Sequence, residues 1–186
     1  TLDRSSAASD VYKRQCMDMP IETAYLPKRV ENEITESILR DRNHPSIVQW
    51  ELFNEIRRPV LANMLKPMSL KARELDPTRL ILDESGGWAE GANLYLPYST
   101  KAFKFNDIHN YPGWRVFENW ISAFEGVGLH EEEKKSRNLP MKGPGNNVVP
   151  GLPVFLSEIG YGSITDFQKT NTIFKTTRKI FNKEFD

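Results

Sequence analysis

The stretch RDRNHPSIVQWELFNEI, residues 40–56, decides the fold class of this 186-residue chain. Its β-branched and aromatic side chains between Ser46 and Phe53 predict a strand that is largely buried. The strand nevertheless ends on an amide and a carboxylate, Asn54 and Glu55, which an apolar core would not accommodate without partners. This polar end indicates that the strand emerges at a functional site.

Helical and strand-like patterns alternate on either side of this strand. The spacing of apolar residues, interrupted once by Pro67, predicts helices over 26–42, 60–75, 114–124 and 166–181. Apolar runs bounded by turns predict further strands within 76–87, over 103–109 and within 152–162. The charged segment 128–151, rich in Gly, Pro and Asn, reads as an exposed loop.

This alternation predicts an α/β fold in which parallel strands are joined by helical crossovers. Two architectures fit the pattern, an open doubly wound sheet and a segment of a (β/α)8 TIM barrel. Both build their sites at the carboxyl ends of the strands. On the strand quoted above, alternation places Gln49 and Glu51 inside such a barrel, and Val48, Trp50 and Leu52 under the helices. Glu51 would then need a partner inside, which this chain is at risk of lacking.

Composition narrows the classes of function. The 25 basic and 25 acidic side chains cancel, so no net field favours nucleic acid or an anionic membrane surface. Cys16 is the single cysteine, which excludes an internal disulfide and a zinc site built from cysteines. No run of about 18 apolar residues predicts a membrane span. Cellular localisation stays open.

The first fifteen residues, TLDRSSAASDVYKRQ, show no sustained period. The chain that follows becomes patterned abruptly and is long enough for one sizeable core. We therefore predict a non-native or disordered tail over 1–15 and one domain over 16–186.

Polar residues end each of the four predicted strands. The set comprises Asn54 and Glu55, then Asp83, Glu84 and Ser85, then Asp107, His109 and Tyr111, and finally Ser157 and Glu158. The chain has no G-x-S-x-G, no Gly-rich phosphate loop and no H-E-x-x-H. A cation site at Asp83, Glu84 and Asp107 is a competing reading that no ligand spacing supports.

Two carboxylates on opposite sides of a pocket suit hydrolysis of a glycosidic bond. One must be protonated to release the leaving group, and the other must be ionised. Glu55 and Glu158 form the best pair, and Asn54 is placed to hold a sugar hydroxyl. Exposed faces of Trp and Tyr suit the apolar faces of sugar rings.

Two segments carry a family resemblance. RNHPSIVQWELFNE resembles the acid/base signature of glycoside hydrolase family 2, which includes β-galactosidases, β-glucuronidases and β-mannosidases, and PVFLSEIGYG resembles its nucleophile segment. The resemblance implies a (β/α)8 barrel and a retaining double displacement. It makes Glu55, at the end of strand four, the acid/base and Glu158, near the end of strand seven, the nucleophile.

Two shorter segments extend the resemblance. DIHNYPG resembles strand six, which implies that Tyr111 hydrogen-bonds the nucleophile and His109 contacts the sugar. DESGGW resembles strand five and places Trp88 near the pocket rim, while Asn54 is expected at the substrate 2-hydroxyl. Gln49 departs from the family, which usually has an apolar residue there. The retaining mechanism requires no metal or other cofactor.

The resemblance implies a retaining exo-β-glycosidase that acts on a carbohydrate substrate. The balanced charge and the lack of a long apolar run predict neither nucleic acid nor membrane as a partner. The resemblance also implies a fragment, because barrel strands one to three, strand eight and the accessory β-sandwich domains are not matched. We therefore expect the isolated chain to have little or no activity. Two alternatives remain, a non-catalytic carbohydrate-binding or structural remnant of the fold and a glycosidase of another retaining TIM-barrel family.

Overall fold

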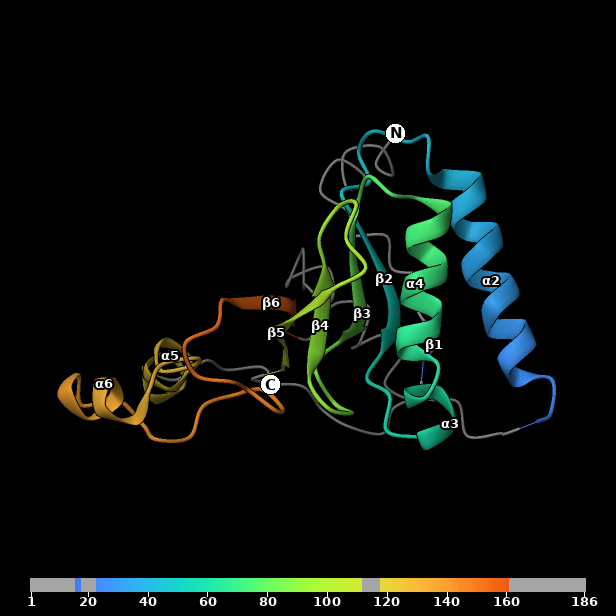
Figure 1. The fold of residues 1–186 in the computed structure, drawn as a ribbon. Coiled ribbons are helices and arrows are strands. Elements are labelled where there is room, and N and C mark those ends of the chain that lie inside the picture. Colours follow the sequence, from blue (N-terminus) through green and yellow to red (C-terminus); the bar gives the residue numbers. More distant parts are fainter. Residues whose placement is uncertain (1–15, 18–22, 112–117, 161–186) are drawn as a thin grey trace, which may run out of the picture.

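The computed structural model describes residues 16–17, 23–111 and 118–160, which form one six-stranded sheet with helices (Figure 1). The predictions of a tail over 1–15 and of a closing helix over 166–181 lie outside these residues. Within them the elements are β1 (Cys16–Met17), α2 (Leu26–Asp41), β2 (Gln49–Asn54), α3 (Pro59–Ala62), α4 (Leu65–Leu75), β3 (Leu80–Ser85), β4 (Ala92–Tyr95), β5 (Ala102–Asn110), α5 (Glu118–Glu125), α6 (Glu131–Ser136) and β6 (Val154–Ile159). None of the described helices is long and apolar enough to cross a membrane.

The strands follow one another in the sheet in chain order, but they are not all parallel. β1, β2 and β3 run parallel, and so do β5 and β6. β4 lies between β3 and β5 and is antiparallel to both. The prediction of parallel strands alternating with helices is therefore wrong at this point. The connection contains Gly86, Gly87, Gly91 and Pro97, which disfavour a helix.

β1 is a strand that the sequence did not predict. Cys16 and Met17 pair in parallel with Phe53 and Asn54 of β2. The sheet therefore continues beyond β2 on the side away from β3. Two residues carry too little pattern to be recognised from the sequence.

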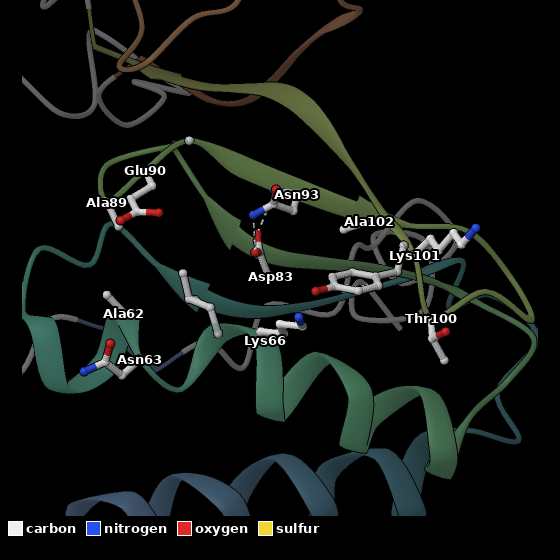
Figure 2. A pocket seen from close by; sticks show the side chains of 13 residues that line it. Ala62, Asn63, Lys66, Asp83, Ala89, Glu90, Asn93, Thr100, Lys101 and Ala102 are labelled. Carbon is white, nitrogen blue, oxygen red and sulfur yellow. Dashed lines mark hydrogen bonds between the residues drawn. The ribbon is translucent and has the colours of Figure 1, made fainter.

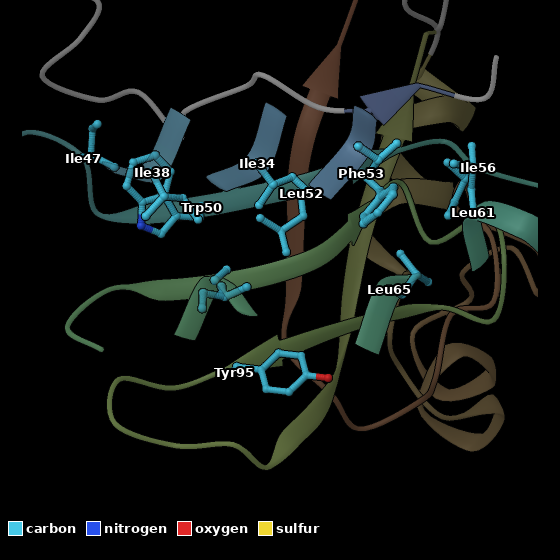
Figure 3. Packing of buried hydrophobic residues seen from close by; sticks show 13 residues of the cluster. Ile34, Ile38, Ile47, Trp50, Leu52, Phe53, Ile56, Leu61, Leu65 and Tyr95 are labelled. Atoms are coloured by element: carbon cyan, nitrogen blue, oxygen red, sulfur yellow. The ribbon is translucent and has the colours of Figure 1, made fainter. Parts of the chain in front are cut away.

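The main core lies between the sheet and helices α2 and α4, which pack side by side on one face (Figure 1). Ile34 and Ile38 of α2 meet Trp50 and Leu52 of β2 there (Figure 3). The predicted helix over 26–42 and the outward position of Trp50 are confirmed. Val48 was expected on the same face but is 58% exposed, because β2 begins only after it.

The Glu51 side chain is buried, and it does not lack a partner. Gln49 donates a hydrogen bond from Nε2 to Glu51 Oε1 at 3.2 Å, and Glu51 has further interactions. Gln49, the residue that departs from the family pattern, thus supplies an internal partner two positions away on the same face.

The segment over 128–151 is mostly loop, as predicted, but it contains the short helix α6. His130 and Glu133 form a reciprocal capping box at its start, and three glutamates occupy its first turn. Both features stabilise a helix N-terminus. None of its side chains is buried, so the charged run is solvated surface.

Asp76 ties the amino-terminal ends of β2 and β3 together. Its side chain accepts hydrogen bonds from Trp50 Nε1 at 2.9 Å, Thr78 Oγ1 at 2.7 Å and Arg79 Nη1 at 2.7 Å. Burial would raise the pKa of Asp76, but the hydrogen bonds from Thr78, Trp50 and Arg79 outweigh burial and hold the pKa below its usual range.

Replacing Asp76 by alanine should lower the free energy of unfolding by about 3 kcal/mol, because it strands a buried Trp50 donor and the Arg79 cation. Urea denaturation at pH 7 measures the change. The loss should shrink as pH falls, since protonation of Asp76 already removes its contribution in the wild-type chain. Glu74→Ala, which removes an exposed ion pair with Lys71, is the matched control and should cost less than about 0.5 kcal/mol. Equal losses in both variants would contradict the role of Asp76.

Candidate active site

Three side chains meet at the carboxyl ends of β2, β5 and β6. Glu55, His109 and Glu158 each offer an oxygen or nitrogen atom, and these atoms lie within 4.8 Å of one another. The structure thus brings together residues that are 54 and 49 positions apart in the chain. Parallel strands explain the meeting, because their carboxyl ends share one edge of the sheet.

Glu55 is placed by an unusual backbone conformation. Its φ is +49°, in the left-handed region that non-glycine residues seldom adopt. Its N–H donates to the carbonyl oxygen of Ser85 at 3.1 Å, which keeps the residue tied to β3 although β2 has ended. The Glu55 side chain remains 27% exposed, so its carboxylate is open to a ligand.

His109 lies between the two carboxylates. Its buried ring places Nδ1 2.7 Å from Glu55 Oε1 and 3.6 Å from Glu158 Oε2. The short contact to Glu55 is a hydrogen bond in either of two states: the imidazole donates to a carboxylate, or a protonated Glu55 donates to the ring. Nε2 lies 3.7 Å from Asp107 Oδ1. His109 therefore couples the two acids and fixes the position of Glu55.

Glu158 reaches the site through an irregularity in the ladder between β5 and β6. Ile108 pairs with Leu156, but His109 pairs with Glu158, so Ser157 is an extra residue. Bulges of this kind redirect the side chains next to them. Tyr111, which follows β5, donates a hydrogen bond from its hydroxyl to Glu158 Oε2.

Asp107 and Gly86 lie beside His109 and are hydrogen-bonded to each other. Asp107 Oδ1 accepts hydrogen bonds from the Gly86 N–H and from Ser157 Oγ, both at 2.6 Å. Gly86 has a φ of +86°, and a Cβ there would lie 2.8 Å from Trp88 Cδ1 and 2.9 Å from His109 Nδ1. Only glycine fits this position without displacing the histidine.

Gly86→Ala should therefore destabilise the chain by about 1–3 kcal/mol, through backbone strain and overpacking. It should also push His109 away from Glu55 and reduce any activity that depends on the pair. Urea denaturation and a rate assay of the same protein measure both effects. Gly126→Ala is the control, because its Cβ would meet only ordinary contacts at 3.5 Å or more. A Gly86 variant as stable and active as the control would contradict the close packing.

Asn54 is the last residue of β2 and directly precedes Glu55. Its side chain is buried, and Ser85 Oγ donates to Asn54 Oδ1 at 2.9 Å. This bond between β2 and β3 orients the amide next to Glu55.

Trp88 is half-buried on the loop after β3. The Arg57 guanidinium lies over its ring, 3.8 Å from the centroid, in a cation–π contact. One face of the indole is therefore covered by a cation, a contact that the prediction of Trp88 near the pocket rim did not include. In the sequence only the position of Arg57, two residues after Glu55, hinted at this contact.

The suggested cation site at Asp83, Glu84 and Asp107 does not form. In the described part of the chain, the group able to hold a metal consists of Glu55, His109 and Glu158. Asp83 instead accepts hydrogen bonds from the Asn93 N–H and Nδ2, each at 2.7 Å, and so ties β3 to β4. Burial raises the pKa of Asp83 to about 6 although these hydrogen bonds act to lower it.

Asp83 faces a separate cleft of about 640 Å³ (Figure 2). Asn63 and Lys66 from the α3–α4 side line this cleft opposite Asn93 of β4. Neither Glu55 nor Glu158 lines it. The cleft belongs to the helix-covered face of the sheet, whereas the two carboxylates lie at the strand ends.

Comparison with known proteins points to one family. The sequence model described as "Glycosyl hydrolases family 2, TIM barrel domain" matches residues 6–125. A β-galactosidase of Kluyveromyces lactis is 32% identical over 119 residues, which cover 63% of this chain. A β-galactosidase of Photobacterium profundum is 30% identical over 89 residues, or 47% of this chain. No solved structure gives a significant match.

The matched regions are a small part of those relatives. They cover 10% of the Kluyveromyces lactis protein and 8% of the Photobacterium profundum protein. The family match includes Glu55, Trp88, His109 and Tyr111 but ends before Glu158.

Proposed function

The chain belongs to glycoside hydrolase family 2, and on this premise we propose that it carries the catalytic carboxylates of a retaining, exo-acting β-glycosidase. One observation carries the proposal. Carboxylate oxygens of Glu55 and Glu158 lie within 4.8 Å of each other. Retaining enzymes hold their carboxyl groups about 5–5.5 Å apart, whereas inverting enzymes leave about 6.5–9.5 Å for a water molecule.

In the first step Glu55 donates its proton to the glycosidic oxygen while Glu158 attacks the anomeric carbon. The bond to the leaving group breaks, and a covalent glycosyl-enzyme forms on Glu158. Glu55, now ionised, then removes a proton from water. The water oxygen attacks the anomeric carbon, and Glu158 leaves as a carboxylate.

His109 and Tyr111 support these roles. An N–H at His109 Nδ1 can donate to Glu55 Oε1 whether Glu55 is ionised or carries its proton on the other oxygen, and so holds the acid/base in place in both states. The Tyr111 hydroxyl donates to Glu158 and so orients the oxygen that attacks. His109 Nδ1 also lies 3.6 Å from Glu158 Oε2, so the imidazole is close to both carboxylates.

Asn54 and Trp88 are the proposed substrate contacts outside the acids. The Asn54 amide, oriented by Ser85, would meet the 2-hydroxyl of the sugar next to Glu55. The Trp88 face not covered by Arg57 would pack on a sugar ring. Because the named relatives are β-galactosidases, galactosides are the first substrates to test.

We propose that this chain supplies both carboxylates but only part of the wall around them. The matched regions span a tenth or less of the relatives, and a full barrel takes about 250 residues. The isolated 186 residues should therefore hydrolyse aryl glycosides poorly or not at all, while the enzyme completed with the missing barrel strands should turn over.

The proposal is tested on the completed enzyme with a panel of aryl β-glycosides. Proton NMR of the first-formed sugar identifies its anomeric configuration, and retention is the expected result. An inverted product would refute the double displacement. Binding of sugars without any turnover would instead favour the non-catalytic carbohydrate-binding remnant.

A further inference from the structure

Glu84, the penultimate residue of β3, joins two loops at the edge of the candidate site. We call residues 55–58 the Glu55 loop and residues 86–91 the Trp88 loop. The Glu84 carboxyl group accepts hydrogen bonds from the backbone N–H of Trp88 at 3.0 Å and of Ala89 at 3.1 Å. The backbone N–H of Ile56, in the Glu55 loop, is near enough to the same carboxyl group to lower its pKa. One side chain is thus hydrogen-bonded to the Trp88 loop and interacts electrostatically with the Glu55 loop.

This arrangement is costly for an acid. Glu84 has no measurable exposure, and none of the ion pairs among the described residues includes it. Burial, reinforced by neighbouring Asp83, raises the pKa of Glu84 to about 7 even though the backbone hydrogen bonds act to lower it. A buried carboxyl whose partners are backbone donors contributes geometry rather than net stability.

The geometry bears directly on Glu55. Two peptide groups flank this residue, and both are tied to β3. The Glu55 N–H donates to the carbonyl oxygen of Ser85, and the following N–H, that of Ile56, interacts with the Glu84 carboxyl group. Contacts on both sides of Glu55 favour its left-handed backbone and therefore the direction of its side chain toward His109.

The same carboxyl group places the second loop. It accepts hydrogen bonds from the N–H groups of Trp88 and Ala89, while Asp107 accepts one from the Gly86 N–H. The indole consequently lies where the Arg57 guanidinium, from the Glu55 loop, can stack on it.

We propose that Glu84 is a positioning residue, which holds the Glu55 loop and the Trp88 loop in register so that Glu55 meets the leaving group at the required angle. The inference rests on the proposed function of Glu55. It assigns Glu84 no contact with substrate. Because Glu55 is the proposed proton donor, loss of Glu84 should affect most the step that needs proton donation. A displacement of about 1 Å in a catalytic group can cost about 100-fold in rate.

The test compares Glu84→Leu, which removes the acceptors at similar volume, with Glu84→Gln, which keeps one carbonyl oxygen, in the completed enzyme. Glu84→Leu should lower kcat/KM about 100-fold for aryl glycosides with poor leaving groups. It should lower kcat/KM less than about 10-fold for a dinitrophenyl glycoside, whose departure needs little acid assistance. Glu84→Gln should recover most of the loss. Equal losses with both leaving groups, or no recovery in Glu84→Gln, would overturn the proposal.

A second measurement does not depend on activity. Hydrogen–deuterium exchange with mass spectrometry should show faster exchange in peptides covering 54–58 and 86–90 of Glu84→Leu than in wild type. Asp83→Asn is the matched control, because Asp83 binds Asn93 in β4; it should accelerate exchange in 92–95 and leave 54–58 unchanged. If Glu84→Leu does not fold, Glu84→Asp draws the acceptors back by about 1.5 Å and should give the same pattern at smaller size.

The two proposals fail separately. If the wild-type enzyme hydrolyses no glycoside, the proposed function is wrong, and exchange in 54–58 and 86–90 still decides whether Glu84 ties the loops. If the wild type is active but exchange in both loops is unchanged by Glu84→Leu, the positioning role is wrong and the proposed function stands.

Discussion

Glu158→Gly in the completed enzyme should lower kcat by about 10⁴- to 10⁶-fold on aryl β-glycosides, the size of loss typical for a covalent nucleophile. Sodium azide should restore turnover, since the glycine leaves room for a small anion on the face that Glu158 occupied. Attack from that face inverts the anomeric centre, so the product should be the α-glycosyl azide. Product NMR and steady-state rates with and without azide measure both effects.

The control for this variant lies one residue away. Ser157→Ala removes the hydrogen bond to Asp107 from the same irregular part of β6 and should cost far less than loss of the nucleophile. A Glu158→Gly enzyme that stays inactive in azide, although folded, would count heavily against nucleophilic attack by Glu158. An equally inactive Ser157→Ala enzyme would also count against this role, because the loss of activity would then come from disturbing the bulge.

Glu55→Gln should produce a different pattern. For substrates with poor leaving groups, kcat/KM should fall by about 10²- to 10⁴-fold, the usual contribution of a general acid. Dinitrophenyl glycosides should still form the glycosyl-enzyme on Glu158, but water would then lack its base, so the intermediate should accumulate. Mass spectrometry of the protein should detect one added sugar, and stopped-flow absorbance should show a burst of released phenol.

Azide separates the two glutamates. It needs no base, so it should rescue breakdown of the intermediate in Glu55→Gln and give the β-glycosyl azide, the opposite anomer to that from Glu158→Gly. Glu90→Gln, on the exposed part of the Trp88 loop, is the control and should leave rates near those of wild type. A uniform loss with all leaving groups, without an accumulated intermediate, would refute the acid/base role of Glu55.

The sequence predicted the elements in which pattern and local chemistry agree. β2 combines β-branched and aromatic residues with a polar end, and α2 has a clear helical period, so both are confirmed. β4 was missed because its four residues are specified by pairing with β3 and β5, and pairing across a sheet is not visible in a short run. The same reason hid β1.

Much of the site was predictable for the opposite reason. Glu55, His109 and Glu158 stand at strand ends, where a barrel gathers its functional side chains. The contacts around them were not predictable, because they depend on backbone details. No sequence pattern shows that Glu84 accepts hydrogen bonds from the N–H groups of Trp88 and Ala89 or that Arg57 stacks on Trp88. The partner of Glu51 was nearer than expected, two residues back along its own strand.

The antiparallel direction of β4 has a consequence for how a substrate would enter. In an ordinary βα unit, the loop after a strand leads to a helix outside the sheet and is anchored in the ladder at one end only. The Trp88 loop instead begins at β3 and ends at β4, so backbone pairing pins both of its ends. Most of its ordering entropy is therefore lost during folding rather than during binding. We therefore expect the Trp88 loop to keep one conformation with and without bound substrate. Any opening or closing of the pocket would involve other loops.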